Sequence, residues 1–253
     1  MNTQNAAPLN KGHTEGVKQP VPSVVASFRS IQPRGNLMGF ATLVIDGAVQ
    51  VNDVRVLTGK NGIYAGMPSV KNREGDYVNL CNPVTAEMNA AVNKAVDAAY
   101  SAAVDAASKK QKVTQQLPEL SGNGSSISVS VHPLKAVPDS NTVGMARVTV
   151  SEHFVIGNIK VVKGKNGIFP SMPSVSVPPR DGDEGAPREY KDVCKVSDSL
   201  RNALQKAVRE GYNKAMDKGE RGKVSVQEIL KEKQAKAKAA PAAEASKKDA
   251  PAI

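Results

Sequence analysis

The stretch Val54–Val70, VRVLTGKNGIYAGMPSV, decides the fold because the chain contains it twice. It returns 105 residues later as Ile159–Val175, IKVVKGKNGIFPSMPSV, with ten of the seventeen aligned positions identical. Most of the remaining pairs exchange similar side chains, such as Tyr64 for Phe169. Repetition at a fixed offset indicates a duplicated structural unit. The 253-residue chain is therefore predicted to consist of two copies of one small module.

Each copy of this stretch predicts a β-hairpin. The segments 54–57 and 63–67 are rich in β-branched and aromatic residues, which favour strands. Between them lies Gly-Lys-Asn-Gly at 59–62, and Gly and Asn tolerate the positive φ angles that tight turns need. Gly-Lys also occurs in phosphate-binding loops, but the sequence lacks the spaced first Gly and the Ser or Thr after Lys that this motif requires. We favour an exposed hairpin turn in both copies.

The sequence on either side of the hairpin repeats as well. Strand-like runs precede it, and a polar loop, a short extended piece and a long helix follow it. Apolar residues at spacings of three and four indicate the helices, with Thr85 and Ser197 as N-caps. The apolar stripes are led by Met88, Val92 and Val96 in the first copy and by Leu200, Leu204 and Val208 in the second. This order predicts an α+β fold, with two tandem copies of a small antiparallel sheet covered by one long helix.

The expected domain boundaries follow from the repeat and from composition. We expect a disordered leader at 1–22, the first module at 23–108, a linker at 109–126, the second module at 127–217, and a Lys/Ala-rich, mostly disordered tail at 218–253. Within the tail, 224–238 is compatible with a short helix. A flexible linker of this length spans roughly 24 Å. The two modules can therefore pack against each other as an internal pseudo-dimer.

The net charge of +10 favours polyanionic partners. Residues 23–108 contain seven basic and seven acidic side chains, 121–217 contain thirteen and ten, and 218–253 contain nine and five. The basic character therefore belongs to the second module and the tail. The sequence shows no apolar run long enough to span a membrane and no signal-peptide pattern. We expect a cytoplasmic protein without a membrane partner.

The two cysteines, Cys81 and Cys194, fall at equivalent places in the two copies. Two cysteines exclude a disulfide framework and a Cys-rich zinc site. We predict that both thiols are reduced and buried, each under its own helix.

Residues with catalytic or metal-binding chemistry are few and scattered. The three histidines, His13, His132 and His153, are isolated in the sequence, which favours a surface or packing role. No catalytic motif occurs. The loop inserted in the second copy contains Asp181, Asp183 and Glu184, for which a solvated loop is favoured over a metal site. We therefore expect a protein that is not an enzyme, with no cofactor, no catalytic residue and no metal site.

The second helix carries the more informative surface. Its polar face contains Arg201, Asn202, Lys206, Arg209 and Asn213. A helix with one apolar and one basic face can lie on phosphates or enter a groove, and an ordinary solvated face is the alternative. The comparable region of the first helix includes Asp97 and Asp105. The first helix is therefore predicted to bind anions poorly.

The repeated pattern resembles the stage V sporulation protein G (SpoVG) family. The resemblance rests on the hairpin with Gly-Lys-Asn-Gly-Ile and Met-Pro-Ser, followed by Gly75, Tyr77, Pro83 and the helix ending at Tyr100, and it extends over Ser23–Tyr100 and Ile127–Tyr212. It implies small bacterial proteins tied to septation and sporulation that bind DNA and RNA as regulators and usually dimerise. The family's basic residue in the first helical turn is matched by Arg201, where the first copy has Asn89.

These observations together predict a nucleic-acid-binding regulator, for DNA or RNA, built from two SpoVG-like modules. The candidate binding residues are Arg201, Lys206, Arg209, Lys163, Lys165 and Lys60. The expected partners are nucleic acid and, within the chain, one module for the other; assembly of several chains stays open. The alternative is a protein-interaction module in cell division or in a mobile element.

Overall fold

The computed structural model describes residues 20–72, 74–111, 115–122, 125–135, 140–177 and 189–238, and its elements repeat in one order. The first module contains β1 (Val24–Arg34), β2 (Leu37–Ile45), β3 (Val49–Gly59), β4 (Gly62–Gly66), β5 (Ser69–Lys71), β6 (Tyr77–Asn79), β7 (Cys81–Pro83) and α1 (Ala86–Ser108). The second contains β8 (Ile127–Pro133), β9 (Thr142–Val150), β10 (Phe154–Gly164), β11 (Gly167–Ser171), β12 (Ser174–Val177), β13 (Glu189–Asp192), β14 (Cys194–Val196) and α2 (Asp198–Lys238). The predicted α+β fold of two tandem modules is confirmed.

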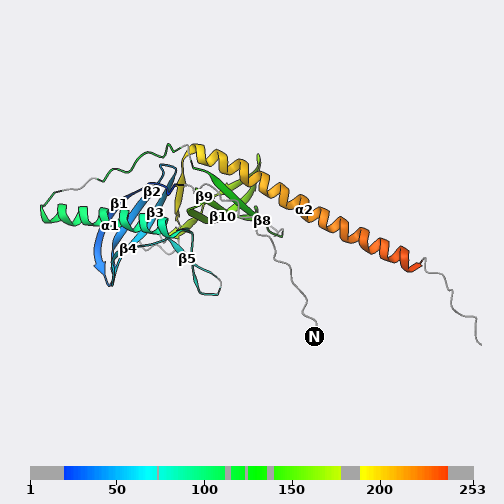
Figure 1. Cartoon of the computed structure of the whole chain (residues 1–253), viewed down its shortest axis with the longest axis horizontal. Coiled ribbons are helices and arrows are strands. Elements are labelled where there is room, and N and C mark those ends of the chain that lie inside the picture. Colours follow the sequence, from blue (N-terminus) through cyan, green and yellow to red (C-terminus); the bar gives the residue numbers. More distant parts are fainter. Residues whose placement is uncertain are drawn as a thin grey trace, which may run out of the picture.

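Each module places one helix on an antiparallel sheet. The first sheet has the order β1-β2-β3-β14 with β4 also on β3, and the second has β11-β10-β9-β8 with β7 also on β10. The helix α1 packs on β1, β4 and β7, while α2 packs on β8, β9 and β11 (Figure 1). Two further strand pairs, β5–β6 and β12–β13, form short arms outside these sheets.

The two modules exchange the strand that precedes each helix. In the first module, β7 pairs with β10 of the second, with Cys81 opposite Ile156. In the second module, β14 pairs with β3 of the first, with Cys194 opposite Val51. One continuous set of buried side chains draws on both modules. This reciprocal pairing is what an internal pseudo-dimer requires, and it makes each sheet incomplete without the other module.

A bulge in each long strand makes the exchange possible. The register of β3 against β2 shifts between Ala41 and Leu43, and Asp53 lies there with a φ of 54°. The first half of β3 pairs with β14, and the second half pairs with β4. The equivalent irregularity in β10 holds Asn158 with a φ of 52°. Bulges bend a strand and increase its twist, so one strand serves two partners in turn.

Both cysteines are free and buried, as predicted. They lie on the exchanged strands β7 and β14, and the Cys81 side chain forms a hydrogen bond with Cys194. This hydrogen bond to Cys194 and burial raise the pKa of the Cys81 thiol far above its usual range. The Cys81 thiol therefore stays protonated inside the shared core.

The described part of the segment predicted as a flexible linker is attached to the modules. The side-chain amide of Gln115 accepts a hydrogen bond from the Phe28 N–H at 2.6 Å and donates one to the Ala99 carbonyl at 2.8 Å. The Gly122 N–H donates to the Gly47 carbonyl at 2.9 Å. A Cβ on Gly122 would collide with the Asp46 carbonyl oxygen, so only glycine fits this approach. The linker therefore docks on the first module before the second module begins at β8.

The helix α2 is longer than the sequence suggested. It continues from Asp198 to Lys238 without a break and passes the boundary placed after Asp217. Lys, Ala and Glu are good helix formers and outweigh the two glycines in this stretch. Figure 1 shows the second half of α2 extending beyond the sheets. The predicted leader up to residue 19 and the tail from 239 onward lie outside the described residues.

Candidate nucleic-acid interface

The hairpin of the second module positions the first group of candidate side chains. Gly164 pairs with Gly167 across the turn, which leaves Lys165 and Asn166 at the tip. Gly167 has a φ of 99°, as Gly62 has 101° in the first module. In each turn the residue with positive φ is thus the second glycine and not the asparagine. Glycine adopts positive φ more easily than any other residue. Lys165 is exposed at the turn as a result.

The start of α2 positions the second group. The Leu200 N–H donates to Ser197 Oγ at 3.2 Å, and the Arg201 N–H donates to the Ser197 carbonyl at 2.8 Å. Ser197 is therefore the N-cap predicted from the sequence, and Thr85 caps α1 through the Met88 N–H at 3.2 Å in the same way. A side-chain acceptor at the N-cap satisfies amide groups that the helix cannot. Arg201 consequently lies in the first turn of α2 with its side chain exposed.

Three of the six candidate residues gather where the hairpin meets α2. Lys165 and Arg201 line one cavity of about 450 Å³ between them, together with Gln205. Arg209 lies two turns after Arg201, and its Nη2 atom is 3.9 Å from the position that a Cβ on Gly167 would take. We call this region the second junction. It brings two guanidinium groups and an ammonium group to one surface.

The other three candidates lie elsewhere. Lys163 is exposed on β10 opposite Ile168, one residue before the glycine that opens the turn. Lys206 is exposed one position beyond Gln205, which rotates it by about 100° around the helix and away from the hairpin. Lys60 lies at the turn of the first module, equivalent to Lys165. The structure therefore does not bring Lys206 or Lys60 to the second junction.

The equivalent region of the first module, the first junction, has different chemistry. Asn89, Asn93 and Asp97 stand on α1 where α2 has Arg201, Gln205 and Arg209. The Ala65 N–H donates to Asn93 Oδ1 at 2.9 Å and ties β4 to α1. The residue equivalent to Ala65 in the second module is Pro170, which has no backbone N–H to donate. Gln205 and Pro170 were not among the residues predicted from the sequence. Alignment of the two copies could have pointed to them, because they replace Asn93 and Ala65.

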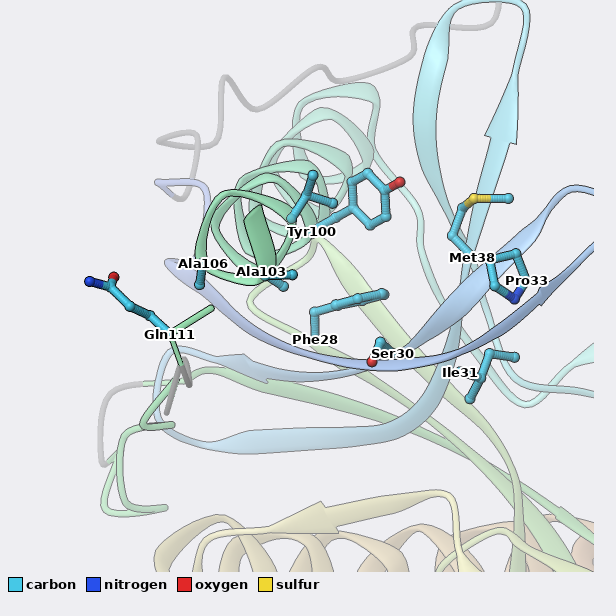
Figure 2. A pocket seen from close by; sticks show the side chains of 11 residues that line it. Phe28, Ser30, Ile31, Pro33, Met38, Tyr100, Ala103, Ala106 and Gln111 are labelled. Carbon is cyan, nitrogen blue, oxygen red and sulfur yellow. The ribbon is translucent and has the colours of Figure 1, made fainter. Parts of the chain in front are cut away.

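A separate cavity lies on the first module between β1, β2 and the end of α1. It has a volume of about 350 Å³ and is lined mainly by apolar groups such as Phe28, Met38 and Tyr100 (Figure 2). The rings of Phe28 and Tyr100 meet edge to face with centroids 5.3 Å apart. None of the residues that line this cavity carries a charge. It therefore lacks the groups that would bind phosphates.

The described residues provide little for catalysis or metal binding. No group of three or more His, Cys, Asp or Glu side chains among them could hold a metal ion. His153 Nδ1 lies 2.8 Å from Thr85 Oγ1, so this histidine packs at the capped start of α1. Asp181, Asp183 and Glu184 fall in a range that the structure does not describe. Within the described ranges, no helix is both long enough and apolar enough to cross a membrane.

Comparison with known proteins identifies the repeated unit. The model of the SpoVG family matches residues 24–102 and again residues 125–214, which together cover well over half of the chain. Several relatives bear the name "Putative septation protein SpoVG", and three of them illustrate the similarity. The one from Caldanaerobacter subterraneus subsp. tengcongensis is 42% identical over 71 residues, 28% of this chain and 69% of that protein. The one from Treponema denticola is 36% identical over 64 residues, 25% of this chain and 69% of that protein. The one from Caldicellulosiruptor saccharolyticus is 32% identical over 67 residues, 26% of this chain and 76% of that protein. Each relative spans about the length of one module, and the chain therefore belongs to the SpoVG family as a tandem duplication of its unit.

Proposed function

We propose that this chain is a non-enzymatic regulator that binds DNA or RNA through the second junction. The observation that carries the proposal is the convergence of Arg201, Arg209 and Lys165 on one exposed surface beside a cavity. Phosphate contacts from Arg and Lys supply most of the affinity of proteins for nucleic acids. The family's link to septation, carried by the names of its members, fits a role in gene control during cell division. We place this role in the cytoplasm.

The charges at the second junction are available to a ligand. No salt bridge of Arg201, Arg209 or Lys165 occurs within the described part of the chain, where Arg29 and Asp53 form an ion pair at 3.4 Å on the first module. Cations without an ion pair keep their full attraction for phosphates, and no carboxylate among the described residues has to be displaced from these three first. At the first junction Asp97 would instead repel a phosphate. The second module is accordingly the binding module in this proposal.

A protein-interaction module is the second candidate function. The exposed tyrosines of the two arms favour it: Tyr77 on β6 is 69% exposed, and Tyr190 on β13 is 72% exposed. Tyrosine is enriched in protein interfaces because it contributes a large apolar area with a polar end. Binding that is insensitive to salt and depends on Tyr77 and Tyr190 would favour this function over the first.

The test compares two variants in binding to a random oligonucleotide pool at two salt concentrations. One chain ends at Asp217 and lacks the extended half of α2 and the basic tail. The other is full length with Arg201, Lys206 and Arg209 changed to Ala. We expect the truncated chain to keep salt-dependent binding and the triple variant to lose most of it, because phosphate contacts release counterions. Loss of binding on truncation, with the triple variant intact, would assign the affinity to the tail.

The first module offers a two-charge control for this test. Lys60 and Lys94 are the equivalents of Lys165 and Lys206. The variant K60A/K94A removes the same kind of charge from the other module and should leave binding within about twofold of the parent. An equal loss in K60A/K94A and in the triple variant would indicate a general charge effect.

A further inference from the structure

The second junction contains an opening between its hairpin and its helix. Its cavity of about 450 Å³ lies between the β10–β11 hairpin and the first turns of α2. Pockets for small molecules typically measure about 300–1,000 Å³. The cavity is therefore large enough for a group bigger than a phosphate ion.

The two junctions differ in the residues at two equivalent positions, one on the strand and one on the helix. In the first module the Ala65 N–H and Asn93 Oδ1 form a hydrogen bond of 2.9 Å that holds β4 to α1. In the second module Pro170 removes the donor, and Gln205 is longer than asparagine by one methylene group. Both Pro170 and Gln205 line the cavity. The hydrogen bond that holds β4 to α1 in the first module thus has no equivalent at the place where the second module has its cavity.

The residues around the cavity combine three kinds of chemistry. Lys165 and Arg201 supply positive charge, while Asn166 and Gln205 supply amide donors and acceptors. Phe169 belongs to the same lining and is 41% exposed. A phosphate needs only the cations, whereas a nucleobase also uses an aromatic face for stacking and amides for its hydrogen-bonding edge.

We propose that this cavity accepts one unstacked nucleotide, with its base against Phe169 and the amides and its phosphate on Arg201 and Lys165. The inference rests on the proposed function and names its substrate class, because a base in a duplex is paired and stacked and cannot enter. The ligand is therefore single-stranded DNA or RNA, or an unpaired base in a folded strand. A free nucleotide has the same chemistry and is distinguished by the experiment below.

The experiment measures dissociation constants for a single-stranded oligonucleotide and for the duplex of the same sequence. The decisive variant is P170A/Q205N, which rebuilds the Ala65–Asn93 pair in the second module without changing any charge. We expect the parent to favour the single strand by at least about tenfold and the variant to bind both forms alike, with duplex affinity unchanged. Unchanged duplex affinity, together with a single cooperative thermal unfolding transition, shows that the variant is folded.

A second pair of variants addresses the base directly. Phe169→Ala should weaken single-strand binding by about fivefold or more, since stacking of one base on an aromatic side chain is worth ~1–3 kcal/mol. Tyr64→Ala is its matched control, because Tyr64 lies against Gly59 in the first module as Phe169 lies against Gly164 in the second. The control should have no effect on single-strand binding.

The outcomes separate the inference from the function on which it rests. A parent protein that binds neither form in a salt-dependent way overturns the proposed function and the inference with it. A parent that binds single strand and duplex equally, or a P170A/Q205N variant that keeps the preference, overturns the inference alone. The last measurement uses free adenosine monophosphate as the ligand. Calorimetric binding of this mononucleotide as tight as that of the oligonucleotide identifies a free nucleotide as the ligand and overturns the assignment to a nucleic-acid strand.

Discussion

The first and second junctions share a backbone plan and differ in what the helix offers to the hairpin. At the first junction an asparagine bonds to the strand, and an aspartate stands where an anion would approach. At the second junction Pro170 cannot donate that hydrogen bond. Arg201 stands at the position of Asn89, and Arg209 stands at the position of Asp97. The first junction therefore has a hydrogen bond and an acidic residue where the second has arginines and lacks that hydrogen bond. The shared core explains why both copies remain, since each completes the other's sheet.

The largest expected effect comes from breaking what the two modules share. Phe154 is fully buried and lies opposite Pro83 of the exchanged strand β7. The change Phe154→Ala should lower the free energy of unfolding by about 3–5 kcal/mol, and the whole chain should unfold in one transition. Circular dichroism during denaturant titration measures this effect. Two separate transitions, with only the second module weakened, would mean that the modules fold independently.

A smaller effect on stability is expected at Cys81 and Cys194, which occupy equivalent positions in the two modules. The raised pKa of Cys81 means that the folded protein keeps this proton when the unfolded chain, near the ordinary thiol pKa of 9.0, has lost it. The folded state then binds more protons than the unfolded state, so its stability falls as pH rises above that value. The expected slope is about 1.4 kcal/mol per pH unit.

Denaturant titration at pH 8, 9 and 10 measures this slope, with Cys81→Ala as the control for other groups that titrate in the same range. The stability of the parent relative to the control should fall as pH rises above about 9 and should not change with pH below about 8. A difference that does not change with pH would mean that the Cys81 thiol ionises in the folded protein.

The smallest effects separate the two junctions themselves. Asn93→Ala removes the acceptor for the Ala65 N–H and should cost about 1 kcal/mol of stability. Gln205→Ala, at the equivalent position, should change stability by less than about 0.5 kcal/mol because Pro170 offers no N–H for it to accept. Both values come from denaturant titration of the full chain. Equal losses at the two positions would show that Gln205 has a structural hydrogen bond after all.

Local patterns were sufficient to predict much of the fold. The hairpins, both helices and the N-caps Thr85 and Ser197 were predicted because turn residues, apolar spacing and capping act within a few residues. The exchange of β7 and β14 was not predicted, since a three-residue strand carries no pattern that identifies its partner. Docking of the linker through Gln115 also depends on contacts far apart in sequence.

The candidate site could be predicted only in part for the same reason. A helical wheel groups Arg201 with Lys206 and Arg209, but the hairpin approaches only Arg201 and Arg209, and Lys206 is rotated by about 100° from Gln205 around the helix. The roles of Pro170 and Gln205 depend on a hydrogen bond that only the other module shows. Comparing the two copies residue by residue is the step that reveals them.

The central claim is that the second junction, and not the overall positive charge, binds nucleic acid. The most direct test replaces its two arginines by the residues of the first junction, as R201N/R209D, and measures the dependence of oligonucleotide affinity on salt concentration. Each lost phosphate contact should reduce the slope of log affinity against log salt by about one unit. The account predicts a slope smaller by at least about two units than that of the parent. An unchanged slope would contradict it and place the phosphate contacts elsewhere on the chain.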